Sequence, residues 1–272
     1  MKRYIEIGNR MFELGKRTYI MGILNITPDS FSDGGRYIDI NKAVLHAKEM
    51  IAQGADIIDI GGESTRPNHT PVGEKEELDR VIPVIRALKK EIEVPISIDT
   101  YKAKVAEAAV IEGAALINDV WGFKKEPGIA EVAAGFGAAC CLMHNREKND
   151  YKDLMADILR DLEESINIAL RAGVKEDRII LDPGIGFAKS YEENLTVMNR
   201  LELIYSLGYP VLLGTSRKSM IGNALNLPPE ERVEGTVATT VIGIMKKCDF
   251  VRVHDIKENK RAAVMTDVIV RR

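Results

Sequence analysis

The chain has little of what marks a secreted or membrane protein. It contains three cysteines in 272 residues, and two of them, Cys140 and Cys141, are adjacent within an apolar segment. An odd number of cysteines in such surroundings argues against a disulfide framework and indicates buried thiols in a reducing compartment. The first residues have no apolar core of signal-peptide length, and no segment reaches the roughly 18 apolar residues of a membrane span. We therefore expect a cytoplasmic protein.

An excess of charge of one sign is also missing, because 38 Lys and Arg residues nearly balance 41 Asp and Glu residues, for a formal net charge of −3. Such a balance gives no general attraction to nucleic acid or to an anionic membrane, although a local basic pocket is compatible with it. The four histidines lack the spacing of zinc ligands. Neither a Ser-His-Asp nor a Cys-His arrangement can be argued from the sequence.

What is present is a regular alternation of two kinds of segment. From Thr18 onward, short β-branched segments alternate with longer segments of helical periodicity. The expected strands are residues 19–24, 57–60, 96–98, 115–117, 139–143, 179–181, 211–213 and 250–253. The expected helices are residues 41–53, 75–91, 102–112, 129–136, 152–172, 192–207, 229–247 and 257–270. Eight nearly continuous apolar strands, each followed by a helix, predict an α/β protein with the parallel, eight-stranded (β/α)8 TIM barrel.

An open doubly wound sheet is the competing architecture. It usually has fewer strands and carries its phosphate site in the first strand-to-helix turn, and that turn lacks G-x-G-x-x-G here. Before the barrel, residues 4–7 and 11–14 alternate in polarity on both sides of a short turn. This pattern predicts an N-terminal β-hairpin within residues 1–16, placed to plug the N-terminal end of the barrel. Without a break in composition, we expect one domain over residues 1–272.

Polar or charged residues follow each expected strand. The carboxyl ends of parallel barrel strands meet at one rim, where the active sites of such barrels lie. The residues at this rim are Asn25, Glu63, Arg66, Asp99, Asn118, Asp119, His144, Asn145, Asp182, Ser216, Arg217, Lys218, Ser219, Arg252, His254 and Asp255. Helix capping accounts for some of them, such as Asp255. It accounts poorly for Arg252 and His254, which flank Val253 and therefore point to the same side of the strand.

The seventh unit of the barrel resembles an anion site. Residues 214–222 combine hydroxyl groups, two cations and an expected helix start, although the Walker spacing is absent. Taken alone, a solvated basic helix start would explain this segment nearly as well. Together with Arg252 and His254 on the neighbouring strand, it favours an oxyanion such as diphosphate. Arg66, in a polar and glycine-containing second loop, also suits an anionic group.

The carboxylates suggest a second half of the site. Asp182 directly follows a buried strand and can accept two N–H groups from an aminopyrimidinone edge. Asn118 can donate and accept beside it, and Asp99 can lie opposite. A hard-cation site formed by Asn25, a diphosphate oxygen and water would suit Mg²⁺, which binds through substrate phosphates and keeps water ligands.

Several longer motifs point to a family. Residues 22–35 (GILNITPDSFSDGG) and 59–67 (DIGGESTRP) are followed in order by 98–100 (IDT), 117–120 (INDV), 181–187 (LDPGIGF), 214–219 (GTSRKS) and 252–255 (RVHD). Over residues 18–255 the chain thereby resembles dihydropteroate synthases, which are pterin-binding barrels. The resemblance implies the condensation of 7,8-dihydropterin-6-ylmethyl diphosphate with 4-aminobenzoate in folate biosynthesis, a homodimer formed through late barrel helices, and competition by sulfonamides.

The resemblance also implies roles for single residues. The pterin would be held by Asp99, Asn118, Met143, Asp182, Phe187, Lys218 and Arg252. The diphosphate would be bound by Asn25, Thr65, Arg66, Arg252 and His254, with Mg²⁺ near Asn25. The aminobenzoate would lie among Phe31, Thr65, Pro67, Phe187, Lys218 and Ser219. The residues implied in the chemistry are Asp99, Asp33, Lys218 and Arg252, with the two carboxylates stabilising a cation formed when diphosphate leaves.

One segment departs from the family pattern, and three other functions compete. After His144 the family often has a Gly-x-Pro stretch, whereas residues 145–150 read NREKND. This puts the shape of the fifth loop in doubt. The first competing function is a pterin-barrel methyltransferase acting on a corrinoid, which has no use for a diphosphate cluster. The second is a Schiff-base aldolase using Lys218, which would need an apolar pocket around the lysine. The third is a pterin carrier without activity, which would not need the two long loop motifs.

Overall fold

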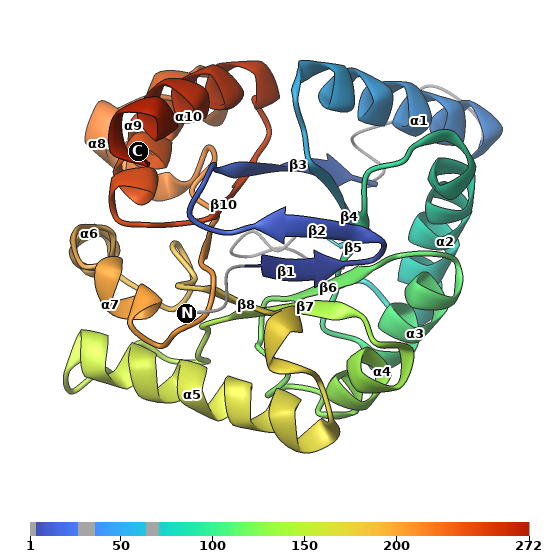
Figure 1. Cartoon of the computed structure of the whole chain (residues 1–272), viewed down its shortest axis with the longest axis horizontal. Helices are drawn as coiled ribbons and strands as arrows, with labels where there is room; N and C mark the ends of the chain where they lie inside the picture. Colours follow the sequence, from blue (N-terminus) through green and yellow to red (C-terminus); the bar gives the residue numbers. More distant parts are fainter. Residues whose placement is uncertain (1–3, 27–35, 64–70, 272) are drawn as a thin grey trace.

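The computed structural model describes residues 4–26, 36–63 and 71–271, without the side chains of residues 36–39. Its centre is a ring of eight parallel strands (Figure 1). The strands are β3 (Tyr19–Asn25), β4 (Ile57–Gly61), β5 (Ile96–Asp99), β6 (Leu116–Asp119), β7 (Ala139–Met143), β8 (Ile179–Asp182), β9 (Leu212–Leu213) and β10 (Phe250–Val253). The strands are hydrogen-bonded in the order β8-β7-β6-β5-β4-β3-β10-β9, which gives seven pairs of neighbours. A bridge between Leu181 and Val211 connects β8 to the segment of β9 and so closes the ring. The predicted barrel is confirmed.

Helices surround this ring (Figure 1). They are α1 (Arg36–Gln53), α2 (Glu74–Glu91), α3 (Ala103–Ile111), α4 (Gly128–Phe136), α5 (Leu154–Ala172), α6 (Tyr191–Asn199), α7 (Glu202–Tyr205), α8 (Ser219–Leu225), α9 (Val233–Met245) and α10 (Ile256–Val270). Two single-turn 3₁₀ helices are η2 (Glu176–Arg178) and η3 (Pro229–Glu231). One large apolar cluster lies between the outer faces of the strands and the helices. No helix of the described residues is long and apolar enough to cross a bilayer.

Two expected helices differ from the structure. The segment expected as one helix over residues 192–207 forms α6 and the short α7, because the helix ends at Asn199 and restarts at Glu202. The segment expected over 229–247 begins as the turn η3 and becomes α-helical only at Val233. The seventh unit also contains α8, whose seven residues are too few for a periodic signal.

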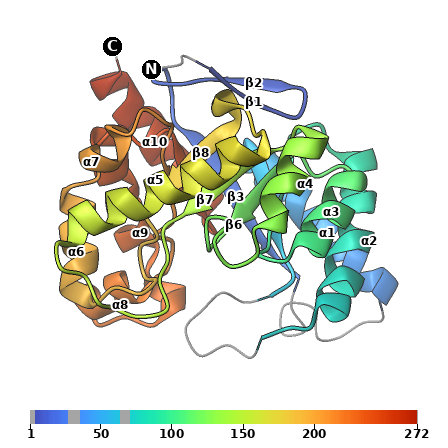
Figure 2. The same cartoon turned by 90° about the horizontal axis from the view of Figure 1, so that it is seen from below.

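The hairpin closes the N-terminal end of the barrel, as the sequence predicted. Strands β1 (Tyr4–Ile7) and β2 (Arg10–Glu13) pair antiparallel across this end (Figure 2). Their buried side chains form a second apolar cluster with the inward-facing residues at the start of the barrel strands. Phe12 lies at its centre, with its ring centroid 4.8 Å from that of Tyr19 and 5.8 Å from that of Phe250. This plug leaves the opposite end, where the strands finish, as the place for a site.

Candidate active site

The inward-facing positions of the strands change from apolar to polar along the barrel. On β10, Phe250 belongs to the cluster under the hairpin, and Arg252, two residues later, lines a cavity at the other end. The same two-residue spacing separates Ile57 from Asp59 on β4 and Ile180 from Asp182 on β8. In each pair both side chains face the interior, the apolar one under the hairpin and the carboxylate toward the other end. The strand register sets these polar ends level with one another, with Asn25 opposite Gly61, Gly61 opposite Asp99, and Asp99 opposite Asn118.

Arg252 joins two buried carboxylates on the floor of the site. Its Nε donates to Asp59 Oδ2 at 2.6 Å, and one terminal nitrogen donates to Asp99 Oδ2 at 2.6 Å. Asn118 Nδ2 also donates to Asp59 Oδ2, at 3.2 Å. Asp59 is fully buried, and Asp99 and Asn118 are nearly so. A buried ion group of this kind is stable only when each charge keeps its partner, so the four side chains form one unit.

The electrostatics of this floor favour a ligand with hydrogen-bond donors. Burial raises the pKa of Asp99 to about 7, Arg252 opposes that rise, and the negative charge of Asp59 adds to it. The second oxygens of Asp59 and Asp99 are buried and have no hydrogen-bond partner among the described residues. Buried acceptors without a partner are costly, which is a reason to expect a bound molecule or water to supply N–H or O–H groups here.

Asp182 and Lys218 form the adjoining wall. Asp182 Oδ1 accepts the backbone N–H of Gly184 at 2.7 Å. Lys218 donates to the carbonyl oxygen of Ile185, and its ammonium lies 4.6 Å from the centre of the Phe187 ring. Burial lowers the pKa of Lys218 to about 8, while the charge of Asp182 acts in the opposite direction. Because Oδ1 of Asp182 already accepts a backbone N–H, Oδ2 is the oxygen that remains as an acceptor for a ligand. The sequence had led us to expect that both oxygens would accept from the ligand.

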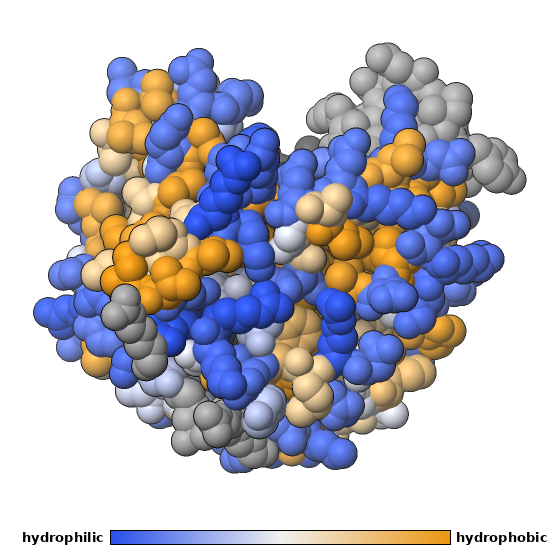
Figure 3. Space-filling model, turned by 45° about the horizontal axis from the view of Figure 1, so that its top comes forward, coloured by the Kyte–Doolittle hydropathy of each residue, from blue (hydrophilic) through white to orange (hydrophobic). Residues whose placement is uncertain are grey.

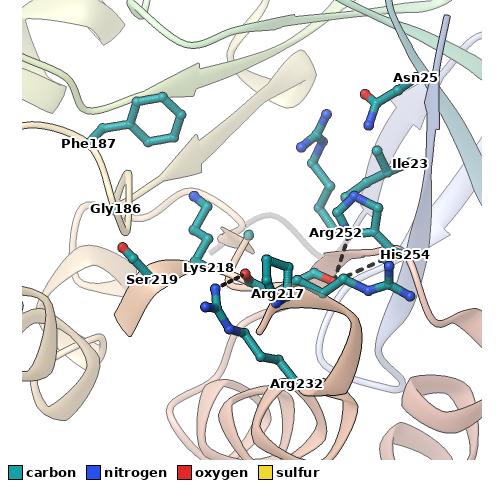
Figure 4. Close-up of a pocket in the computed structure, with 13 residues that line it drawn as sticks. Ile23, Asn25, Gly186, Phe187, Arg217, Lys218, Ser219, Arg232, Arg252 and His254 are labelled. Carbon is teal, nitrogen blue, oxygen red and sulfur yellow. Dashed lines mark hydrogen bonds between the residues drawn. The ribbon is translucent and has the colours of Figure 1, made fainter. Parts of the chain in front are cut away.

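Hydroxyl, imidazole and amide groups lie on the rim side. Ser216 Oγ is 3.0 Å from His254 Nδ1 and accepts the His254 backbone N–H at 3.1 Å. Asn25 lines the same cavity, and its side chain makes no hydrogen bond to another described residue. Lys218 and Arg252 extend into this space, with His254 and Asn25 beyond Arg252 (Figure 4). The cavity has a volume of about 350 Å³. The arrangement combines a carboxylate-rich floor with a cationic and hydroxyl-bearing rim.

Asp182 and Arg252 lie at the same end of the barrel, which the sequence interpretation required. A Cβ atom placed on Gly214, which lies between their strands, would be 3.6 Å from Asp182 Oδ2 and 3.9 Å from Arg252 Cβ. Asp99, Asn118, Lys218, Phe187 and Ser219 also lie on this end, and Met143 ends the inward-facing row of β7. The predictions for Phe31, Asp33, Thr65, Arg66 and Pro67 concern residues outside the described ranges.

Among the predicted rim residues that do not line the cavity, His144 and Asp119 also point away from the interior of the barrel. His144 is completely buried behind the site, where its Nε2 lies 3.1 Å from Asp161 Oδ2 on α5. Asp119 accepts the backbone N–H groups of Trp121 and Phe123, at 2.8 and 2.7 Å, and so stabilises a turn. The expectation that both face the mouth is wrong. Each directly follows an inward-facing residue, Asn118 or Met143, and successive residues of a strand point to opposite faces of the sheet.

Lys218 also differs from expectation. The sequence placed it among polar residues, and this was used against a Schiff-base function. In the structure its ammonium is buried and the pKa of Lys218 is lowered. The expected polar surroundings of Lys218 therefore no longer argue against a Schiff-base function. The choice between the candidate functions depends on the rest of the site and on the similarity to known proteins.

Two residues of the site, Asp59 and Arg232, were not predicted from the sequence, and a third, Arg217, has a partner that was not expected. Asp59 could have been found, since it is a charge in an apolar strand at the same parity as Ile57. Arg217 was seen as a cation of the rim, but it pairs with Asp255 at 2.5 and 3.0 Å. Arg232 lies outside every strand end and donates to the carbonyl oxygens of Arg217 and Leu227, at 2.9 Å each, and nothing in the local sequence marks it.

The fold and the site define a (β/α)8 barrel with a polar cavity at the carboxyl ends of its strands, which is where the active sites of barrel enzymes lie. A family model described as "Pterin binding enzyme" matches residues 21–254. The dihydropteroate synthase of Clostridium beijerinckii is 68% identical over 269 residues, covering 98% of this chain and 100% of that relative. The chain belongs to the dihydropteroate synthase family, a family of pterin-binding enzymes in folate biosynthesis.

Solved structures agree with this assignment. The crystal structure of dihydropteroate synthase from Clostridium difficile in the presence of pteroic acid has a TM-score of 0.94 and 56% identity, covering 96% of this chain and 100% of that chain. The Xanthomonas albilineans dihydropteroate synthase with 4-aminobenzoic acid has a TM-score of 0.93 and 39% identity, covering 99% of this chain and 98% of that chain. The family assignment removes the aldolase and corrinoid alternatives for this site.

Proposed function

We propose that this chain condenses 7,8-dihydropterin-6-ylmethyl diphosphate with 4-aminobenzoate, forming 7,8-dihydropteroate and releasing diphosphate. The observation that carries this proposal is the division of the site into two halves. Asp59, Asp99, Asn118 and Asp182 are buried at the strand ends and present acceptors for the N–H groups of a pterin, whereas Arg252, His254 and Ser216 line the cavity beside them and present donors to a phosphate group. The relatives with pteroic acid and with 4-aminobenzoic acid support the same pair of substrates.

The proposed reaction is dissociative. The dihydropterin ring donates electrons to its methylene carbon, the C–O bond breaks, and diphosphate leaves with the bonding pair. The resulting cation lies beside the buried carboxylates, and fixed negative groups stabilise such a charge without reorganisation. Asp99 has this role in the described part of the site, and Asp33 is a second candidate outside it. The amine nitrogen of 4-aminobenzoate then attacks the methylene carbon and releases a proton.

The departing diphosphate needs positive charge and hydrogen bonds. Arg252 and His254 meet this need among the described residues, and Thr65 and Arg66 are further candidates outside them. The described residues contain no group of three His, Cys, Asp or Glu side chains that could hold a metal ion. The donor set nevertheless suits Mg²⁺, since the Asn25 side chain can complement diphosphate oxygens and water, and a bound Mg²⁺ would neutralise charge on the leaving group.

The aminobenzoate would lie on the outer side of the pterin. Ser219 and Phe187 line the cavity beside Lys218, and Phe31, Thr65 and Pro67 are the candidates outside the described residues. An arylamine is a weak base that attacks in its neutral form, so the reaction requires no strong general base. The buried and paired position of His144 is consistent with this chemistry.

A homodimer and a cytoplasmic location belong to the same proposal. Large apolar side chains on α9 and α10 are exposed, including Met245 at 62%, Met265 at 59% and Ile269 at 58%. Apolar side chains gather on the left of Figure 3, on the side of the barrel that carries α9 and α10. An apolar patch of this kind is typical of a protein interface. The buried, unpaired state of Cys140, Cys141 and Cys248 supports a reducing compartment.

The test is an assay of diphosphate release with both substrates, with and without Mg²⁺. We expect release that depends on 4-aminobenzoate and produces dihydropteroate in equal amount. We also expect a sulfonamide to compete with 4-aminobenzoate, and Mg²⁺ to increase the rate. Diphosphate release that ignores 4-aminobenzoate, or absence of release with both substrates and Mg²⁺, would contradict the proposed function.

A further inference from the structure

A lysine behind the cavity is held by three acceptors at once. Lys189 lies between β8 and α6 and does not line the cavity. Its Nζ donates to His144 Nδ1 at 2.9 Å, to the carbonyl oxygen of Gly184 at 2.9 Å, and to that of Phe187 at 3.1 Å. An ammonium has three N–H groups, and each of them has a partner here.

The other side of the histidine in this group is held by a pair of charged side chains, Asp161 and Arg146. His144 Nε2 lies 3.1 Å from Asp161 Oδ2, and the same oxygen accepts from Arg146 Nε at 2.6 Å. These partners assign the Nε2–H tautomer to His144, which leaves Nδ1 as an acceptor for Lys189. Burial lowers the pKa of His144 to about 4, which keeps the ring neutral and its Nδ1 lone pair available.

The carbonyl groups that Lys189 binds belong to the segment that forms one wall of the pterin half. Gly184 has φ +68°, and a Cβ there would lie 2.0 Å from the His144 carbonyl oxygen, so this segment packs directly on the backbone of the residue that follows β7. The Gly184 N–H donates to Asp182, the Ile185 carbonyl oxygen accepts from Lys218, and the Phe187 ring lies against the Lys218 ammonium. A shift of residues 184–187 would therefore displace three pocket side chains.

The cost of placing a cation here indicates a specific role. Burial lowers the pKa of Lys189 to about 7, and the charge of Asp182 only partly offsets this. Lys218 and Arg146 also disfavour a second positive charge at this position. A buried cation that is held at such a cost beside a site is a candidate for a functional role, and the hydrogen bonds of Lys189 indicate what that role is.

We propose that Lys189 is a positioning residue for the pterin half of the site, acting with His144 and Asp161 to hold residues 184–187. The inference rests on the proposed function, because it assigns the wall of Asp182, Phe187 and Lys218 to the pterin. The anion half does not depend on Lys189, since Asn25, Ser216, Arg252 and His254 come from β3, β10 and the segment after β9. The two halves should therefore respond differently to its removal.

The experiment compares two ligands by calorimetry, a 2-amino-4-oxopteridine without diphosphate and inorganic pyrophosphate. In Lys189→Met we expect the pteridine to bind about tenfold more weakly or worse, the change that loss of a charged hydrogen bond produces, with pyrophosphate affinity unchanged. Lys175→Met is the matched control, because Lys175 is exposed at the other end of the barrel beside η2, and both affinities should stay as they are.

Two further variants keep the test decisive if Lys189→Met folds poorly. Lys189→Gln keeps a two-hydrogen donor and should recover part of the pteridine affinity, and Asp161→Asn should weaken pteridine binding less than Lys189→Met does. Equal weakening of both ligands in these variants, or no change in either, would overturn the positioning role. If the unaltered protein binds pyrophosphate but no pteridine, the proposed function itself fails, and this outcome is distinguishable from failure of the Lys189 inference alone.

Discussion

At the scale of single residues, the site depends on carboxylates that the fold keeps out of water. Asp59, Asp99 and Asp182 are each at most 5% exposed, and the first two pair with the guanidinium of Arg252. In such surroundings a hydrogen bond is stronger than in water, and an unmatched charge is more costly. Ligand binding should therefore depend steeply on the protonation state and the identity of each carboxylate.

Asp99 gives a pH prediction. Burial raises the pKa of Asp99 to about 7, against the effect of Arg252. The protonated acid accepts hydrogen bonds less well than the carboxylate, so affinity for a pteridine without diphosphate should increase as the pH rises through 7. In Asp99→Asn this increase should be absent. Calorimetry at several pH values checks this, and an identical increase in the variant would assign the titration to another group.

Asp182 gives a prediction about charge. In Asp182→Asn the side-chain oxygen can still accept the Gly184 N–H, so the loop keeps its hydrogen bond. The charge-assisted contact to the heterocycle is lost, which should cost about 1.5–3 kcal/mol, or roughly a tenfold to hundredfold weaker pteridine affinity. Pyrophosphate affinity serves as the internal control and should not change. Unchanged pteridine affinity would remove Asp182 from the pterin site.

At the scale of elements, the barrel strands have one structural end and one chemical end. The hairpin closes the first end with Phe12, Ile5 and Ile7, and the polar strand ends form the second. No described hairpin residue lines the cavity at the chemical end. Changes in the hairpin should therefore affect stability far more than chemistry.

Phe12→Ala tests this division. Phe12 is 3% exposed and packs on Tyr19 and Phe250, so the truncation should lower the free energy of unfolding by about 3–5 kcal/mol. The folded fraction should keep its kcat and its KM values. Urea unfolding and steady-state kinetics measure the two effects. A loss of kcat at full folding would show that the plug also shapes the site.

At the scale of the whole molecule, α9 and α10 carry large apolar side chains that a monomer would leave in contact with water. Met265→Glu places a charge in the surface assigned to the proposed homodimer. We expect the unaltered protein to sediment as a dimer and the variant as a monomer, because a charge in an apolar interface loses its solvation. Ile111→Glu is the matched control, because Ile111 on α3 is 63% exposed, close to the 59% of Met265. Equal behaviour of the two variants would place the interface elsewhere.

Much of this molecule could be predicted from the sequence because its signals are periodic. Alternation of strand and helix segments determined the eight-stranded barrel, and the hairpin pattern determined its plug. Parity within a strand determined that Arg252 and His254 share a side, and the position of Asp182 directly after a buried strand determined that it belongs to the site. These are local properties, fixed by the two-residue repeat of a strand and the common direction of parallel strands.

The tertiary structure alone decided which of these groups are partners. Arg252 joins Asp59 and Asp99 across 193 and 153 residues of sequence, and Lys189 meets His144 across 45. Parity gives the side on which a residue lies, but it does not give the neighbour that barrel closure brings to it. The pKa values of Asp99 and Lys218 were likewise set only on burial, because desolvation and the fields of neighbouring charges exist only once the chain has folded.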